Sequence, residues 1–126
     1  MLNKKKAIRI ITNSKWNAHT DPLLRDLQLL SIFNLNKFQT CCFMYKIYYG
    51  LLPTAFLNFF RINSDIHDHQ TRQSSKLHVV SHRTACRANS IQIYGVKLWN
   101  CLSEDITNAP SISIFKSKCK KYLICS

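Results

Sequence analysis

The segment GVKLWNCL at residues 95–102, followed by FKSKCKKYL at residues 115–123, is the most informative part of this chain. The first segment predicts one or two helical turns, and Ser111 is placed to cap a final helix after the break at Pro110. The apolar third of that helix would consist of Ile112, Phe115, Cys119, Tyr122 and Leu123. Lysines fill the rest of its circumference, which predicts a helix with one buried face and one basic face.

Apolar residues recur at helical spacing upstream as well. Residues 4–12 predict a helix on which Ala7, Ile8 and Ile11 share a face. The tripeptide Thr20-Asp21-Pro22 is typical of a helix start, because Thr20 or Asp21 can cap free amides and Pro22 suits the first helical position. The apolar stripe predicted for this second helix is Leu23, Leu24, Leu27 and Leu30.

A third helix is predicted from Asn34 to Gly50, where the glycine can end it in the left-handed conformation. Its apolar residues cover most of the circumference, which is typical of a buried helix. They are Leu35, Phe38, Cys42, Phe43, Met44, Tyr45, Ile47 and Tyr49. The tripeptide Leu52-Pro53-Thr54 predicts a short helix that runs to Phe60.

The middle of the chain has a different character. Residues 61–76 are polar and predict a loop, whereas residues 77–80 and 90–94 favour extended structure, either as a short β-hairpin or as extended arms. The expected fold is therefore mainly α: a small helical domain with those extended segments around residues 77–94. We divide it into a helical segment (1–60), a polar loop with short extended segments (61–94), and the Trp-Asn turn with the basic helix (95–126).

The composition is strongly basic. Eighteen Lys and Arg face six Asp and Glu among 126 residues, which gives a formal net charge of +12. Such a charge attracts polyanions, and it points to contact with RNA or DNA through phosphates. Three groups of cations carry this expectation. They are Lys4, Lys5, Lys6, Arg9 and Lys15 near the start, Arg72, Arg83 and Arg87 in the middle, and Lys116, Lys118, Lys120 and Lys121 at the end.

Catalytic and metal sites find little support in the sequence. A polymerase needs clustered carboxylates to hold two metal ions, and no aromatic-x-Asp-Asp signature is present. His78, His82 and Cys86 would align on a helix, but the residues between them favour extended structure that separates them. We therefore expect no metal, no cofactor and no enzymatic activity of this chain alone. Trp99, Tyr45 and Phe115 could stack on bases, although their apolar neighbours favour core packing.

The six cysteines indicate an intracellular setting. They form no CxxC pair, and no secretory signal precedes them, so we expect reduced thiols in the cytoplasm or nucleus and no secretion. The longest uncharged apolar stretch, residues 47–60, is too short to span a bilayer, which predicts no membrane partner.

The order of several short motifs resembles the region after the polymerase core in reverse transcriptases of jockey-like non-LTR retrotransposons. Each motif is weak alone, but together they cover nearly the whole chain in the family's order. They are Lys5–Thr12 (KKAIRIIT), His19–Leu23 (HTDPL), Phe43–Lys46 (FMYK), Leu52-Pro53, Thr71-Arg72, Leu98–Leu102 (LWNCL) and Phe115-Lys116.

The resemblance implies a piece C-terminal to the fingers, palm and thumb of an RNA-directed DNA polymerase. The family's catalytic aspartates lie upstream and have no counterpart here, so the resemblance gives no catalytic residues to these positions. We expect the chain to be a fragment, and its abrupt helical start agrees with that expectation. Two roles remain open: electrostatic holding of nucleic acid beside the polymerase core, or docking on the thumb as an interaction module without nucleic-acid contact.

Overall fold

The computed structural model describes residues 2–66, 68–69 and 71–125, and its regular elements are almost entirely helical. The mainly α expectation is therefore confirmed. The elements in chain order are α1 (Leu2–Ile11), α2 (Thr20–Asp26), α3 (Ile32–Tyr48), η1 (Thr54–Phe59), η2 (Asn63–Asp65), α4 (Ala85–Ala88), η3 (Ile91–Gly95), α5 (Val96–Cys101), α6 (Glu104–Thr107) and α7 (Ile112–Cys125).

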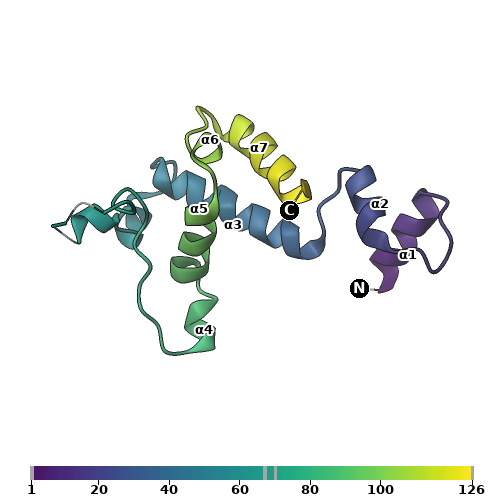
Figure 1. The fold of residues 1–126 in the computed structure, drawn as a ribbon, viewed down its shortest axis with the longest axis horizontal. Helices are drawn as coiled ribbons and strands as arrows, with labels where there is room; N and C mark the ends of the chain where they lie inside the picture. Colours follow the sequence, from purple (N-terminus) through teal and green to yellow (C-terminus); the bar gives the residue numbers. More distant parts are fainter. Residues whose placement is uncertain (1, 67, 70, 126) are drawn as a thin grey trace.

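Helix α3 is the centre of the arrangement. Helix α7 lies along it, and α5 crosses it, while α1 and α2 pack on each other as a hairpin at one end (Figure 1). The Asn34 side chain at the start of α3 donates to the Leu123 carbonyl near the end of α7, at 2.8 Å, which shows that the two helices run antiparallel. The first and last segments of the predicted division thus share one core.

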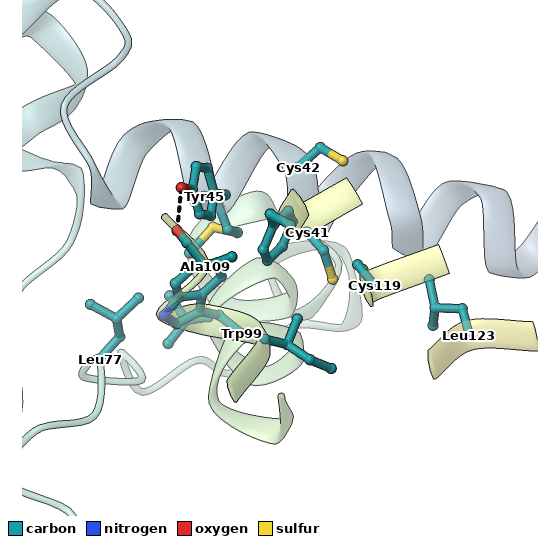
Figure 2. Packing of buried hydrophobic residues seen from close by; sticks show 12 residues of the cluster. Cys41, Cys42, Tyr45, Leu77, Trp99, Ala109, Cys119 and Leu123 are labelled. Carbon is teal, nitrogen blue, oxygen red and sulfur yellow. Dashed lines mark hydrogen bonds between the residues drawn. The ribbon is translucent and has the colours of Figure 1, made fainter. Parts of the chain in front are cut away.

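That core joins α3, α5, α6 and α7. Its members include Met44, Val96, Trp99 and Phe115, which are all at most 5% exposed. The Tyr45 hydroxyl donates to the Ala109 carbonyl at 2.7 Å inside it, so the one polar atom of this ring is satisfied (Figure 2). Trp99 and Phe115 stack at 5.9 Å between ring centroids. The expectation that Trp99, Tyr45 and Phe115 pack in the core is confirmed.

The first three helices end in the same way. A residue with positive φ follows each of them: Asn13 (50°), Gln28 (52°) and Gly50 (64°). In each case the next residue donates back to a carbonyl five residues earlier, as in Ser14 to Arg9, at 2.9 Å. Gly50 was predicted as a helix terminator. The apolar stripe predicted for the second helix is interrupted, because the helix ends before Gln28, and Leu27 and Leu30 therefore lie beyond the end of α2.

Two predicted helix starts are displaced. Ser31, and not Asn34, caps α3, because its hydroxyl accepts the Asn34 amide at 3.2 Å. The residue before α2 is His19, which makes no side-chain cap, so neither Thr20 nor Asp21 has the predicted capping role. Pro22 is the third residue of α2 and not the first. Ser111 does cap α7, as predicted, with its hydroxyl 3.3 Å from the Ile114 amide.

The predicted β-hairpin is wrong. Residues 91–95 form a π-helical turn that continues directly into α5, and Gly95 explains it. A Cβ at Gly95 would lie 2.9 Å from the Met44 sulfur and from Ile91 Cδ1, so a larger residue here would force these side chains to shift, and glycine favours the close approach of this turn to α3. Tertiary packing therefore overrides the alternating pattern.

The extended segment 77–80 pairs with a partner that the sequence pattern did not indicate. Leu77 forms an isolated antiparallel bridge with Ile62, in the segment that was expected to be a loop. His67 and Gln70 of that segment lie outside the described residues. On the other edge, Asn100 accepts the Leu77 amide (3.1 Å) and donates to the Leu77 carbonyl (2.8 Å). The side-chain amide of Asn100 thus acts as a strand partner and attaches the middle of the chain to α5.

Candidate nucleic-acid interface

The N-terminal cations lie on α1 and on the loop that follows it. Lys4, Lys5, Lys6 and Lys15 are exposed, whereas Arg9 is half-buried. The Arg9 Nε donates to the Ala18 carbonyl at 2.9 Å, so this arginine fastens the loop to the helix. Four of the five predicted residues are therefore free to meet phosphates through their whole side chains, and Arg9 also has a structural role.

The three arginines of the middle segment do not form one group. Arg72 lies in a turn of the segment before Leu77, where it lines a polar groove that Glu104 also lines. Arg83 precedes α4, and Arg87 lies in its last turn. Figure 1 places α4 and the segment 61–76 (teal) at separate corners of the fold. All three side chains are exposed, but the fold presents Arg72 apart from the other two.

The lysines of α7 divide according to the face that they occupy. Phe115, Cys119 and Leu123 are the buried residues of this helix. Lys118 forms an ion pair with Asp105 of α6 at 2.7 Å and also donates to the Asp105 carbonyl at 3.0 Å. Exposed Lys116 and Lys120 are four residues apart and therefore share a face on the other flank. Lys121 projects from the side opposite to the buried residues, by the 100° helical repeat.

Helix α3 adds two cations that sequence reasoning missed. It contains Lys37 and Lys46 and no acidic residue, and α7 contains four lysines and no acidic residue. The two longest helices therefore pack side by side with six lysines and no carboxylate of their own. The available signal was the absence of Asp and Glu from the whole stretch 32–48.

The electrostatics of Cys42 locate two of these lysines. Burial raises the pKa of the Cys42 thiol to about 11, and the neighbouring Cys119 acts in the same direction. The ammonium groups of Lys116 and Lys46 act against that rise in pKa. Both cations therefore lie near this thiol at the α3–α7 contact, and Lys120 follows Lys116 by four residues on α7. We call Lys46, Lys116 and Lys120 the lysine face.

The other two thiols of this contact pair with each other. The hydrogen bond with Cys119 lowers the pKa of Cys41, and the same bond raises the pKa of Cys119. Cys41 and Cys119 are at most 2% exposed, and Figure 2 shows both between α3 and α7. They belong to the packing of the two helices, as expected for cysteines on apolar faces.

The acidic residues are dispersed. Asp21 and Asp26 belong to α2, Asp65 to η2, and Glu104 and Asp105 to α6. Within the described part of the chain, no three side chains of His, Cys, Asp or Glu converge as a metal would require. His78 lies in the extended segment, where its ring contacts Asn63 at 3.2 Å, and Cys86 is exposed on α4. The arrangement offers distributed positive charge instead of a cleft with converging ionisable groups.

The comparisons give no independent identification. No known protein family, curated protein or solved structure matches the chain. None of the helices in the described ranges is both long enough and apolar enough to cross a membrane.

Proposed function

We propose that this chain is the catalytically silent C-terminal part of a non-LTR retrotransposon reverse transcriptase and that it holds RNA or DNA by its phosphates. The family part of the proposal rests on the ordered motifs of the sequence. The binding part rests on one observation: the two longest helices pack together with six lysines and no acid of their own. Phosphate contact of this kind positions a nucleic acid without reading its sequence.

The lysine face suits a strand laid across the helix pair. Lys46 comes from α3, and Lys116 and Lys120 come from α7, so the charge spans both helices. The acid nearest in sequence to α7, Asp105, is occupied by Lys118 on the other flank. The exposed lysines of α1 would extend the positive surface at the far end of α3. No divalent cation is needed for such binding.

The test is the affinity of the chain for single-stranded RNA as a function of salt concentration. If several phosphates are neutralised, the logarithm of the binding constant should fall with the logarithm of salt concentration, with a slope of about −0.7 per contact. Lys120→Gln should make this slope shallower by about 0.7, which corresponds to the loss of one phosphate contact. Lys118→Gln is the matched control, because it removes the same charge from the same helix at a lysine already paired with Asp105, and it should leave the slope nearly unchanged. A flat salt response in the native chain would refute the proposal.

A second candidate is an interaction module that docks on the polymerase thumb without nucleic-acid contact. It is favoured by large apolar side chains exposed around the hairpin and the start of α3. They are Ile10 (69%), Ile11 (70%), Leu29 (47%), Ile32 (47%) and Phe33 (69%). A chain with such a surface should associate with itself in isolation. Sedimentation at increasing concentration checks this, and a monomer at every concentration would count against the second candidate.

A further inference from the structure

We infer that Trp16 is a stacking platform for an unpaired base, so that the nucleic acid held by this chain is single-stranded near the hairpin. This inference rests on the proposed nucleic-acid binding and goes beyond it, because phosphate contacts alone do not distinguish single strands from duplexes. The observation behind it is the contrast between the two tryptophans: Trp99 is 5% exposed in the core, and Trp16 is 86% exposed.

Trp16 occupies the corner of a closed turn. The Ala18 amide donates to the Lys15 carbonyl at 3.0 Å, which places Trp16 and Asn17 at the two central positions of the turn. Its exposed fraction of 86% shows that the Trp16 side chain at this corner is not covered by the helices that the turn connects. The indole ring is therefore largely open to a ligand.

Arg9 holds the turn from both sides. Its carbonyl accepts the Ser14 amide at 2.9 Å before the turn, and its Nε donates to the Ala18 carbonyl at 2.9 Å after it. Thr12 strengthens the first stem, since its hydroxyl lies 2.8 Å from the Ser14 hydroxyl. The backbone that carries Trp16 is thus fixed before any ligand arrives, which reduces the entropy lost on binding.

The part of the sequence that carries this ring is cationic. Lys15 precedes it, Lys4, Lys5 and Lys6 lie on the preceding helix, and residues 1–20 contain no acid. An aromatic ring on a positively charged surface is the combination that binds single strands: the cations follow the phosphates while a base stacks on the ring. In a duplex the bases are already stacked on one another, so the same ring gains almost nothing. A polypeptide bound at this site would need acidic side chains to pair with these lysines. The experiment must therefore distinguish a protein ligand from a single-stranded nucleic acid.

The experiment compares binding of the full chain to a uridine oligonucleotide of about 12 nucleotides and to a duplex of equal length at low salt. Trp16→Ala should weaken single-strand binding by about 5-fold to 100-fold, which corresponds to one stacked base, and should change duplex binding by less than about 2-fold. Trp16→Phe should retain part of the affinity because it keeps a ring. Ile10→Ala is the matched control, since it removes another exposed apolar side chain of the same hairpin, and it should leave the affinity unchanged.

Indole fluorescence gives a second readout. The single-stranded oligonucleotide should quench the exposed Trp16, and the quenching should disappear in Trp16→Phe, which retains buried Trp99. Salt-dependent binding with no quenching, or with equal losses on single strand and duplex in Trp16→Ala, overturns the inference while the proposed function survives. Loss of self-association in Trp16→Ala with unchanged oligonucleotide affinity also overturns it and assigns the ring to a protein contact. Failure of the native chain to bind either probe at any salt concentration refutes the proposed function as well.

Discussion

The N-terminal hairpin and the α3–α7 helix pair both contain large apolar residues but bury them to different extents. In the helix pair the large side chains pack against one another, and Met44, Phe115 and Cys119 are at most 1% exposed. In the hairpin, Ile8 and Leu24 are buried, whereas Ile10 and Ile11 are about 70% exposed. Both regions therefore form helices, but of the two only the helix pair has an apolar core of its own.

This difference separates stability from binding. Buried apolar area sets most of the free energy of folding, so the helix pair should determine the global stability of the chain. The hairpin contributes few buried contacts and should open locally at a lower cost. It nevertheless contains the more exposed of the two tryptophans and four exposed lysines. These side chains are available to bind a ligand and contribute little to the stability of the fold.

Truncation of Phe115 should have the largest effect. This ring is fully buried between α3 and α7, so Phe115→Ala should lower the free energy of unfolding by about 3–5 kcal/mol. Leu24→Ala in the hairpin should instead accelerate amide exchange in α1 and α2 while α3 and α7 keep their protection. Urea unfolding and hydrogen exchange check both statements. If Phe115→Ala prevents folding, the milder Phe115→Leu should still show the shift, and equal global losses from the hairpin variant would break the comparison.

Asn100→Ala should have the next largest effect. Its side-chain amide satisfies both backbone groups of Leu77, so truncation leaves a buried amide and a buried carbonyl without partners. The expected loss is about 1–3 kcal/mol. Urea unfolding measures it, with Asn58→Ala as a control at an exposed position. Losses of equal size in the two variants would show that the segment 61–80 is not attached to α5 through Leu77.

The sequence was sufficient for the parts of the fold in which local chemistry and packing agree. The buried residues Phe115, Cys119 and Leu123 of α7, the cap at Ser111 and the terminator at Gly50 all follow from rules that act within a few residues, whereas Tyr122 of the predicted stripe is 40% exposed. The sequence reasoning failed where a distant contact decides the local structure. The alternation of Ile91 and Ile93 favoured a strand, but these residues form a helical turn that packs on α3, with Gly95 close to Met44.

The candidate interface divides in the same way. Cations could be counted from the sequence, and those of α7 were found. Lys46 was not found, because it is an isolated lysine whose importance comes from the antiparallel packing of α3 on α7. Trp16 was also missed: its exposure depends on the turn that Arg9 closes, and no local pattern distinguishes it from a buried tryptophan.

The Cys42 thiol should make the helix pair sensitive to alkaline pH. Its pKa is about 11 in the folded chain against an ordinary value of 9.0, so the unfolded chain releases this proton first as pH rises. Stability is therefore fully present below about pH 9 and falls between pH 9 and 11, by about 1.4 kcal/mol at pH 10. The measurement is the free energy of unfolding from pH 8 to 10 in the native chain and in Cys42→Ala. The difference between them removes the contribution of lysine titration, and a pH-independent difference would contradict the assignment.

The smallest effect concerns Tyr45 of α3 and Tyr49, the C-cap of this helix, which make similar hydrogen bonds in different surroundings. The Tyr45 hydroxyl donates to Ala109 in the core, and the Tyr49 hydroxyl donates to Thr107 at the surface, at 2.7 and 2.8 Å. Tyr45→Phe leaves a buried carbonyl without its donor and should lower the free energy of unfolding by about 1–1.5 kcal/mol. Water can replace the hydroxyl of Tyr49, so Tyr49→Phe should lower it by less than about 0.5 kcal/mol. Urea unfolding of the two variants compares one chemical change at two depths of the same helix. Equal losses would mean that the α3–α7 core admits water near Ala109, and the contrast drawn between a closed helix pair and an open hairpin would then have to be abandoned.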